Sequence, residues 1–316
     1  MDEGAVHVVR PGLLTTVQDL GRWGYQAAGV PVAGPMDTFS HRLANLLVGN
    51  SRDAATLEIT LIGPELEFDV PAMVAVCGAD FEVMCNSQPI ANSTATMIPR
   101  GSRIQFGRRL SGARAYLAVN GGFRTAVVLG SRATHLVCAM GGVAGRALIA
   151  GDRLPVIAKP GEVSGRRASG LPLPGKGRAR LRIVPGPQAD WFSTQTATTL
   201  SSVSFRVSPR SNRMGYRLEG PPLVRERMTE PISEPLAFGA IQVPAAGEPI
   251  LLMADRQTAG GYPKIASVIA ADLPLAGQLA PGDFIEFSYC SRQEAAAALI
   301  ARERPLLRLA DPTPLA

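Results

Sequence analysis

The chain has 316 residues, of which 46% are hydrophobic and 18% are charged, and its formal net charge is +6 at pH 7. This composition excludes extended disorder, and the length allows about two domains that each bury a core. Only three of the 32 basic residues are lysines, and no stretch interleaves basic with aromatic residues as nucleic-acid modules do. We therefore expect no nucleic-acid partner.

Cysteine spacing and hydropathy argue against metal-binding, redox and membrane proteins. The four cysteines show no C-x-x-C spacing and have no histidine pair nearby, so the sequence predicts neither a zinc site nor a redox dithiol. No apolar run reaches about 18 residues, and the first residues lack the basic and apolar regions of a secretory signal. We expect no membrane association, a cytoplasmic location and reduced thiols.

Short apolar or alternating runs, separated by Gly and Pro, make up most of the chain. The clearest lie at residues 72–86, 102–107, 113–122, 249–254 and 283–290. Strands at this spacing predict a mainly β chain with barrels or sandwiches rather than a parallel α/β sheet.

Three segments predict short helices. In the first, Asp37 can cap the helix and Gly49 can end it, with an apolar stripe between them. The second follows Pro187. The third begins with a capping box at Ser291 and should stop at Pro305.

Residues 159–182 are rich in Gly, Pro and Arg and show no apolar period. This composition is typical of a linker, although its basic character also suits an acidic partner. We place the boundary near residue 172, which predicts one domain over 1–172 and a second over 173–316.

Several common sites can be excluded by motif. The chain has no G-x-x-x-x-G-K-[ST] loop, no G-x-G-x-x-G motif that opens a helix after a strand, and no G-x-S-x-G elbow. His7, His41 and His135 lie far apart in the sequence, so they predict no metal site.

A first polar cluster lies in the turn-rich segment 15–37, "TTVQDLGRWGYQAAGVPVAGPMD". Gln18, Asp19 and Arg22 precede a Gly-Pro turn that leads to Met36 and Asp37. The alternative is a long connection in which Asp37 only caps the following helix.

Two further clusters come from the second half of the chain. The segment "SPRSNRMGYRLEG" contains Arg213 among other polar residues, which are Arg210, Asn212 and Arg217. In "ISEPLAFGAIQVP", Glu234 and Gln242 flank apolar residues, and Glu234 can instead form an ion pair with an arginine.

The loop "DRQTAGGYPK", residues 255–264, follows the apolar run "PILLMA" and holds more donors than a chain reversal needs. Adjacent Gly260 and Gly261 can present successive backbone N–H groups to an anion. The expected site residues of this loop are these two glycines together with Asp255, Arg256, Gln257, Thr258, Tyr262 and Lys264.

A family resemblance is carried by "TTVQDLGRWGY", "GVPVAGPMD", "YLAVNGGF", "LGSRAT", "VPGPQ", "SEPLAFGAIQVP" and "LLMADRQTAGGYPKIASVIAADL". In this order they resemble the biotin-dependent carboxyltransferase family, also called allophanate hydrolase subunit 2, over roughly residues 5 to 290. The resemblance implies two cyclophilin-like β-barrel domains with a cleft between them. Family members include the C subunit of 5-oxoprolinase, the carboxyltransferase region of urea carboxylase, and the Kip protein that antagonises an inhibitor of a sporulation kinase.

The leading hypothesis from this resemblance is the C subunit of an ATP-dependent 5-oxoprolinase, which opens the lactam of 5-oxoproline to glutamate together with a B subunit and an A subunit. Arg256, Lys264 and the glycine amides would stabilise the developing charge. Gln257, Thr258 or Tyr262 would orient the ring. Carboxylates would hold magnesium or a donor in place, and the candidates are Asp19, Asp37 and Asp255.

The chain has no "MKM" biotin acceptor and no region of ATP-grasp size. Biotin is therefore not expected on this chain, and ATP and magnesium would be shared with a partner subunit. Two alternatives remain: carboxyl transfer from carboxybiotin to a urea-type amide, and a non-catalytic antagonist that binds a kinase inhibitor.

Overall fold

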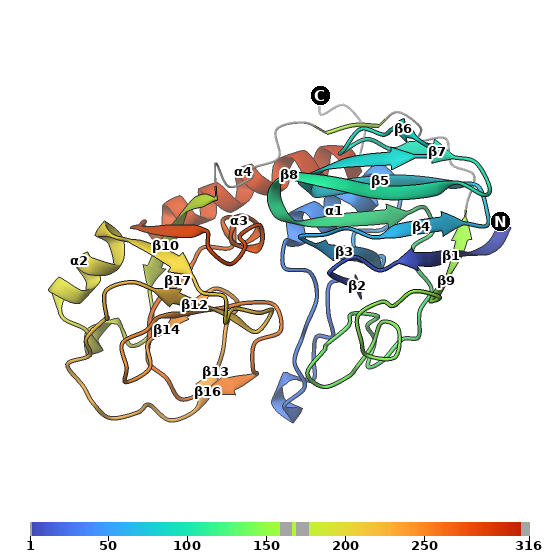
Figure 1. Ribbon diagram of the computed structural model, residues 1–316. Coiled ribbons are helices and arrows are strands. Elements are labelled where there is room, and N and C mark those ends of the chain that lie inside the picture. Colours follow the sequence, from blue (N-terminus) through green and yellow to red (C-terminus); the bar gives the residue numbers. More distant parts are fainter. Residues whose placement is uncertain (1, 159–165, 169–176, 311–316) are drawn as a thin grey trace. The chain divides into compact units, whose positions relative to one another are not determined.

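The computed structural model describes residues 2–158, 166–168 and 177–310 and divides into two compact units (Figure 1). The described residues of unit 1 are 2–23, 33–158, 166–168 and 305–310, and those of unit 2 are 24–32 and 177–304. The domain boundary expected near residue 172 lies outside the described residues and stays a prediction.

Unit 1 is built on a nine-stranded sheet with the order β2-β3-β8-β4-β1-β9, and β5 pairs with β6, β7 and β8. The long strands β5 and β8 form the largest pairing, and register shifts between Gly78 and Val83 interrupt it. The strands are β1 (Asp2–Arg10), β2 (Leu14–Gln18), β3 (Thr56–Thr60), β4 (Glu65–Phe68), β5 (Ala72–Cys85), β6 (Gln88–Pro89), β7 (Thr96–Ile98), β8 (Arg103–Val119) and β9 (Arg153–Ala158).

The apolar run of β5 is buried on both faces of the sheet. Met73 and Ala75 pack in one cluster with Phe39 of helix α1 (Thr38–Leu47). Val74 and Val76 belong to a second cluster on the opposite face. Because side chains alternate along a strand, a continuous apolar sequence is what two covered faces require. Figure 1 shows α1 lying along the sheet.

Unit 2 contains a closed barrel of seven strands in the order β10-β17-β14-β15-β12-β11-β18. The barrel closes through a parallel pairing of β10 with β18, and a separate ribbon is formed by β13 and β16. The strands are β10 (Arg178–Pro185), β11 (Ser204–Val207), β12 (Gly215–Glu219), β13 (Glu234–Pro235), β14 (Ala240–Gln242), β15 (Ile250–Leu252), β16 (Ala259–Gly260), β17 (Lys264–Val268) and β18 (Phe284–Tyr289).

The mainly β class is therefore confirmed, and the predicted runs at 102–107 and 113–122 both fall largely within the single strand β8. The remaining helices are α2 (Thr194–Ser202), α3 (Leu273–Gly277), α4 (Arg292–Ala310) and two 3-10 turns, η1 (Gln26–Ala28) and η2 (Ala189–Trp191). In the described part of the chain, no helix is long and apolar enough to cross a membrane.

The expected caps of the helices are present. Asp37 accepts the backbone N–H of Ser40 at 2.9 Å, and Gly49, with φ +76°, follows the last turn of α1. Ser291 and Glu294 exchange the reciprocal bonds of a capping box at the start of α4.

The prediction that the last helix stops at Pro305 is wrong. Helix α4 continues through Pro305 to Ala310. A proline inside a helix removes one backbone bond. Continuation places Leu306, which is fully buried, in the cluster that also contains Phe39 and Leu43. Burial of a leucine contributes about 1.5 to 3 kcal/mol, which offsets most of that cost.

The expected linker is partly wrong as well. Residues 159–165 and 169–176 lie outside the described residues, but Arg178 to Arg182 belong to β10. Ala179 and Leu181 are buried there, while the arginines between them are more exposed. The segment therefore has the period of two that a strand needs, although arginine makes it resemble a tether.

A substitution at Gly121 should test how closely the chain approaches itself in unit 1. Gly121 has φ +89°, and a Cβ there would lie 2.0 Å from the carbonyl oxygen of Ile157. Gly151 has the same φ of +89° but nothing within 4 Å of its Cβ position. We expect Gly151→Ala to cost about 1 to 2 kcal/mol from backbone strain alone. Gly121→Ala should cost about 1 to 3 kcal/mol more, from overpacking.

Chemical denaturation of the two variants provides the comparison. Equal losses in the free energy of unfolding would show that the approach of Ile157 does not constrain Gly121.

Candidate functional site

The donor-rich loop 255–264 connects β15 to β17, two strands of the unit 2 barrel. Within it, β16 pairs with β13, so that Glu234 lies opposite Gly260 and Pro235 opposite Ala259. The backbone N–H of Leu236 also donates to the carbonyl of Thr258 at 3.0 Å. The structure thus brings this loop together with Glu234, a predicted site residue some twenty positions earlier.

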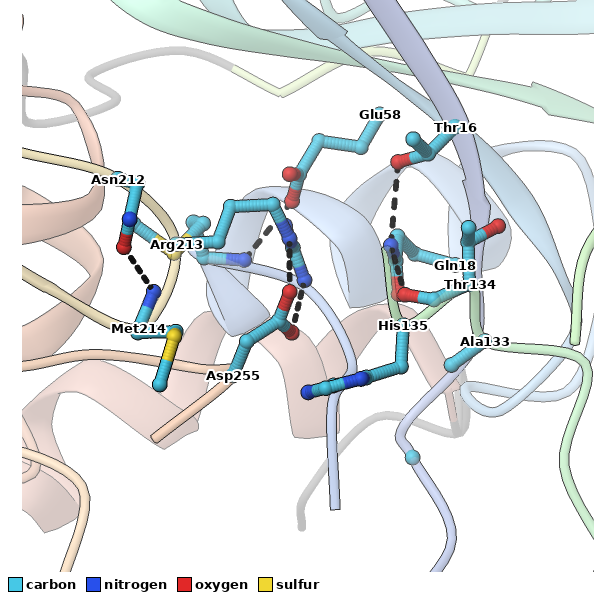
Figure 2. Close-up of polar contacts among 12 residues, drawn as sticks. Thr16, Gln18, Glu58, Ala133, Thr134, His135, Asn212, Arg213, Met214 and Asp255 are labelled. Carbon is cyan, nitrogen blue, oxygen red and sulfur yellow. Dashed lines mark hydrogen bonds and ion pairs between the residues drawn. The ribbon is translucent and has the colours of Figure 1, made fainter. Parts of the chain in front are cut away.

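Asp255 at the start of the loop is buried and accepts two bonds from one guanidinium. Arg213 donates through Nε at 3.0 Å and through Nη2 at 2.9 Å, and both side chains are almost fully buried (Figure 2). The backbone N–H of Asp255 also donates to the carbonyl of Arg213. A bidentate pair of this kind fixes the start of the loop against the segment before β12.

Lys264 at the end of the loop is also paired. Its Nζ lies 2.7 Å from Oε1 of Glu234, and the same oxygen accepts a 2.6 Å bond from the side chain of Gln188. Gln188 in turn accepts the backbone N–H of Lys264. The hydrogen bond from Lys264 holds the pKa of the Glu234 carboxyl below its ordinary value. The lysine is buried, whereas the carboxylate is partly exposed.

Arg256 differs from both of these cations. Its Nε donates to the carbonyl of Leu236 at 2.9 Å, and its guanidinium lies 5.7 Å from the ring centroid of Phe238. Burial lowers the pKa of Arg256, and no carboxylate among the described residues pairs with it. A partly buried guanidinium without an acidic partner is the chemistry of an anion-binding group.

A cavity of about 210 Å³ lies in unit 2 next to this loop. It combines residues from three of the polar clusters recognised in the sequence. Gln242 is buried, and Gln257 and Tyr262 are more exposed. The lining is completed by Arg210, Asn212, Met214, Gly215, Arg217, Leu236, Ile250 and Leu252.

The lining of this cavity suits a small polar molecule. Two arginines can meet negative charge, and the amides of Gln242, Gln257 and Asn212 offer both donors and acceptors. Leu236, Ile250 and Leu252 supply an apolar wall. A few convergent polar groups on an apolar wall are typical of a small-molecule site.

Neither of the two glycines of the loop, Gly260 and Gly261, has a positive φ. Glycine is favoured at these positions because neighbouring atoms leave little room for a Cβ. A Cβ at Gly260 would lie 3.0 Å from Leu236 and 3.3 Å from Nε2 of Gln242, and one at Gly261 would lie 3.2 Å from the carbonyl of Pro231. Pairing with β13 therefore keeps the backbone extended at Gly260.

In unit 1, the segment from Gln18 to Arg22 docks against residues 131–135. Asp19 accepts the backbone N–H groups of Gly21 and Arg132 and the hydroxyl of Ser131. The guanidinium of Arg22 is buried and donates to the carbonyl of Ala133. Gln18 donates to the carbonyl of Thr134 at 3.0 Å and to Thr16 at 3.1 Å (Figure 2). Two motifs of the family resemblance therefore form one local structure.

Met36 and Asp37 enter a second buried network of unit 1. The backbone N–H of Met36 and the hydroxyl of Tyr116 both donate to Oε2 of Glu58, at 2.8 and 2.7 Å. Tyr116 accepts the backbone N–H of Asp37 at 2.8 Å, and burial raises the pKa of Tyr116. In this network Asp37 is the cap of α1, as the alternative interpretation of the sequence expected.

A larger cavity, of about 500 Å³, also lies in unit 1. Asp19 and Arg132 line it together with Asn120 and Gly121. Its polar groups are largely engaged with the protein: Asp19 binds three donors, and Gly121 N–H donates to Asn50. We therefore favour the smaller cavity of unit 2, which Gln242 and Gln257 line. Arg256 is not part of this lining, but it precedes Gln257 in the chain and bonds to the carbonyl of Leu236, another lining residue.

None of the three carboxylates considered for magnesium is directed into an acidic cluster. Asp19 binds backbone and hydroxyl donors, Asp37 binds both donors of Ser40, and Asp255 binds Arg213. Across residues 2–158, 166–168 and 177–310, no group of three or more His, Cys, Asp or Glu side chains is arranged to hold a metal ion.

Sequence reasoning missed several residues that complete these arrangements, namely Glu58, Tyr116, His135 and Gln188. Glu58 carried a usable signal, since a glutamate at an inward position of the apolar strand β3 must be paired. Gln188 and His135 carried no such signal in the sequence, because their roles depend on how distant segments of the chain come together.

The family is shown by comparison with known proteins. The carboxyltransferase domain model, subdomains A and B, matches residues 28–289, and the chain belongs to this family. The C subunit of the 5-oxoprolinase of Escherichia coli (strain K12) is 38% identical over 303 residues, which are 96% of this chain and 97% of that protein. The C subunit of the Haemophilus influenzae 5-oxoprolinase is 36% identical over 281 residues, 89% of this chain and 90% of that protein.

A solved structure supports the same assignment. The crystal structure of the Kluyveromyces lactis urea amidolyase superposes with a TM-score of 0.89 at 32% sequence identity. The match covers 96% of this chain but only 20% of that chain. The present chain therefore corresponds to one region of that larger protein.

The buried pair of Arg213 and Asp255 yields a stability prediction. Arg213→Met should lower the free energy of unfolding by about 3 to 5 kcal/mol, because it leaves the Asp255 carboxylate buried without its partner. Arg206→Met is the matched control, since Arg206 and Glu219 form an exposed pair and its loss should cost less than about 1 kcal/mol. Urea denaturation of both variants measures the difference, and similar losses would contradict the assigned role of the buried pair.

His41 of α1 provides a prediction about pH. The ring is fully buried, Nδ1 lies 2.9 Å from the hydroxyl of Thr56, and burial lowers the pKa of His41 to about 4. The folded pKa lies below the unfolded value, so the unfolded chain binds the proton first as the pH falls. Stability should therefore be lost between about pH 6.5 and 4, by about 3 kcal/mol from this residue.

The matched variant is His41→Gln, which keeps a polar group near Thr56. The wild-type protein should lose more unfolding free energy than His41→Gln across that pH window. If the free energy of unfolding of the two proteins falls in parallel with pH, His41 does not titrate in this way.

Proposed function

We propose that this chain is the C subunit of an ATP-dependent 5-oxoprolinase and acts with a B and an A subunit in the cytoplasm. The observation that carries the proposal is the match to the C subunits of two 5-oxoprolinases over nearly the full length of each protein. The reaction hydrolyses the lactam C–N bond of 5-oxoproline, coupled to hydrolysis of ATP. The carbonyl carbon gains a hydroxyl and the nitrogen gains a proton, which yields glutamate.

The unit 2 cavity supports a substrate of this kind. 5-Oxoproline is small and carries one carboxylate and one planar amide. In our proposal Arg210 and Arg217 of the lining, with Arg256 of the adjoining loop, meet the carboxylate or the charge that develops on the carbonyl oxygen. Gln242 and Gln257 bind the amide, and Tyr262 covers the ring.

We assign positioning roles to the paired residues of the predicted site. The ion pair of Asp255 with Arg213 fixes the start of the loop 255–264. The ion pair of Glu234 with Lys264 fixes its end. Lys264 adds positive charge to the site, reduced by its pairing with Glu234. In unit 1 Asp19 and Arg22 hold the segment 131–135.

The three carboxylates considered, Asp19, Asp37 and Asp255, do not fit a magnesium site, because protein donors already satisfy them, and the described residues contain no acidic cluster that could hold the ion. We therefore propose that nucleotide and magnesium are held by the partner subunits. We also propose that each unit is a cyclophilin-like β-barrel domain, which the closed barrel of unit 2 supports.

A second candidate is carboxyl transfer from carboxybiotin to a urea-type amide. It is favoured by the likeness to the K. lactis urea amidolyase over almost the whole chain. The planar amide of urea would use the same glutamines. This function requires a partner that carries biotin, so ATP-dependent carboxylation of urea with a biotinylated partner would distinguish it.

The proposed function is tested by glutamate release in the complete complex of A, B and C subunits. We expect ATP-dependent release that is lost when this chain is omitted. Arg256→Met should lower turnover about 100-fold, the scale expected for loss of one electrostatic stabiliser. Arg206→Met is the control, because Arg206 lies on β11, outside both the cavity lining and the loop 255–264, and forms an exposed pair with Glu219.

Two outcomes would contradict these claims. Full glutamate release without this chain would refute its assignment to the complex. Normal turnover of Arg256→Met, with folding confirmed by circular dichroism, would refute the role of Arg256 alone.

A further inference from the structure

The larger cavity, of about 500 Å³ in unit 1, has no part in the proposed reaction. Every residue that lines it belongs to unit 1, and none of them lines the cavity of unit 2. Its volume falls within the range of about 300 to 1,000 Å³ that is usual for small-molecule sites. A ligand bound there would therefore be additional to the one proposed for unit 2.

Two guanidinium groups line this cavity, those of Arg124 and Arg132. Arg132 donates through Nη1 to the carbonyl of Thr125, which restrains the guanidinium and leaves its other N–H groups for a ligand. Arg124 is exposed. No carboxylate in the described part of the chain forms an ion pair with either side chain. The cavity thus offers two cations that suit carboxylate groups.

Negative charge lines the same cavity. Asp53 is exposed and has no cationic partner among the described residues. Gly49, Asn50 and Ser51 also belong to the lining, and they follow the C-terminal end of α1 directly. The C-terminal end of a helix carries a partial negative charge, which favours a nearby cation. Together with Asp53 it provides a place for an ammonium group.

This mixture of charges argues against a phosphate or a nucleotide as the ligand. A phosphate would meet the arginines but would be repelled by Asp53 and by Asp19, whose three hydrogen-bond donors are all neutral. A nucleotide base would find no exposed ring on which to stack, because Phe123 of the lining is 1% exposed. Val127, which is 55% exposed, offers apolar surface for a short aliphatic chain.

We propose that the unit 1 cavity binds a free acidic α-amino acid, with the ammonium group at Asp53 and the carboxylates at Arg124 and Arg132. Such a molecule carries one cation and two carboxylates on a short aliphatic chain, which complements the charged side chains of the lining. With L-glutamate as the ligand, this inference rests on the proposed function, whose product is glutamate. 5-Oxoproline has a neutral amide in place of the ammonium group, so the cavity distinguishes product from substrate.

The experiment compares L-glutamate with glutarate, which lacks the ammonium group, by calorimetry on the full chain. The wild-type chain should bind glutamate at least about tenfold more tightly, because only glutamate gives Asp53 a partner. In Asp53→Asn the two ligands should bind equally, and this exposed position allows the substitution without a change in the core. Absence of glutamate binding, equal binding to the wild-type chain, or an unchanged preference in Asp53→Asn would overturn the proposal.

Arg124 is tested with a matched arginine. Arg124→Met should weaken the binding of both ligands about tenfold, because each loses a charged donor to a carboxylate. Arg108→Met is the control, since Arg108 lies outside the lining and forms an exposed pair with Glu82. Equal binding constants for the two variants would overturn the role of Arg124.

NMR locates the ligand without any substitution. The backbone N–H groups of Gly122 and Arg124 lie in the lining and donate to the carbonyls of Val119 and Pro155, both at 2.8 Å. Their signals should shift when glutamate is added to the full chain and stay in place when 5-oxoproline is added. A shift of these signals by 5-oxoproline, or none by glutamate, would overturn the assignment of the cavity.

The outcome separates this inference from the proposed function. ATP-dependent release of glutamate by the complete complex, with no glutamate binding that depends on Asp53, would refute the inference and leave the proposed function intact. Binding of glutamate that depends on Asp53, with no turnover of 5-oxoproline, would refute the proposed function and leave the amino-acid site intact.

Discussion

The cost of burying a charge organises the candidate site in unit 2. Isolated buried charges are expensive, so they occur in pairs or serve a ligand. Arg213 and Asp255 satisfy each other with two short bonds, and Lys264 is satisfied by Glu234. These two pairs fix both ends of the loop 255–264. Arg256 lies between these pairs and is partly buried without an acidic partner among the described residues, which is why we propose it as the group that meets an anion.

In unit 1 the buried charges of Asp19 and Arg22 are met by neutral hydrogen-bonding groups instead. The docking of Gln18, Asp19 and Arg22 against residues 131–135 satisfies many of the polar atoms on both segments. The side-chain oxygen Oε1 of Gln18 and Nε2 of His135 stay without a partner within the described ranges. Hydrogen bonds elsewhere on the same side chains fix which of these atoms accepts and which donates.

The strands and the first helix could be predicted because their signals are local. The apolar run of β5, the Asp37 cap and the Gly49 end of α1 each lie within one segment. Strand β10 was not predicted from the sequence because arginine occupies its outward positions. The continuation of α4 beyond Pro305 was not predicted because it depends on the burial of Leu306. Both depend on tertiary packing, which no local pattern contains.

For the candidate site, too, the sequence shows the local features but not the contacts between distant segments. The residue types of loop 255–264 could be recognised from its density of donors, but not which of them are already paired. Lys264 lies 30 positions from Glu234, Arg213 lies 42 from Asp255, and Gln18 lies 116 from Thr134. Such partners are set by the pairing of strands and the docking of loops, so the proposed division into positioning and binding residues required the structure.

The most direct test of this account is NMR of the guanidinium Nε–H groups of Arg256 and Arg213 during titration of the complete complex with 5-oxoproline. Both arginines belong to unit 2, and of the two only Arg256 lacks an acidic partner within the described residues. The account predicts a saturable shift of the Arg256 signal while the Arg213 signal stays in place. A shift of Arg213 with no change at Arg256 would contradict it.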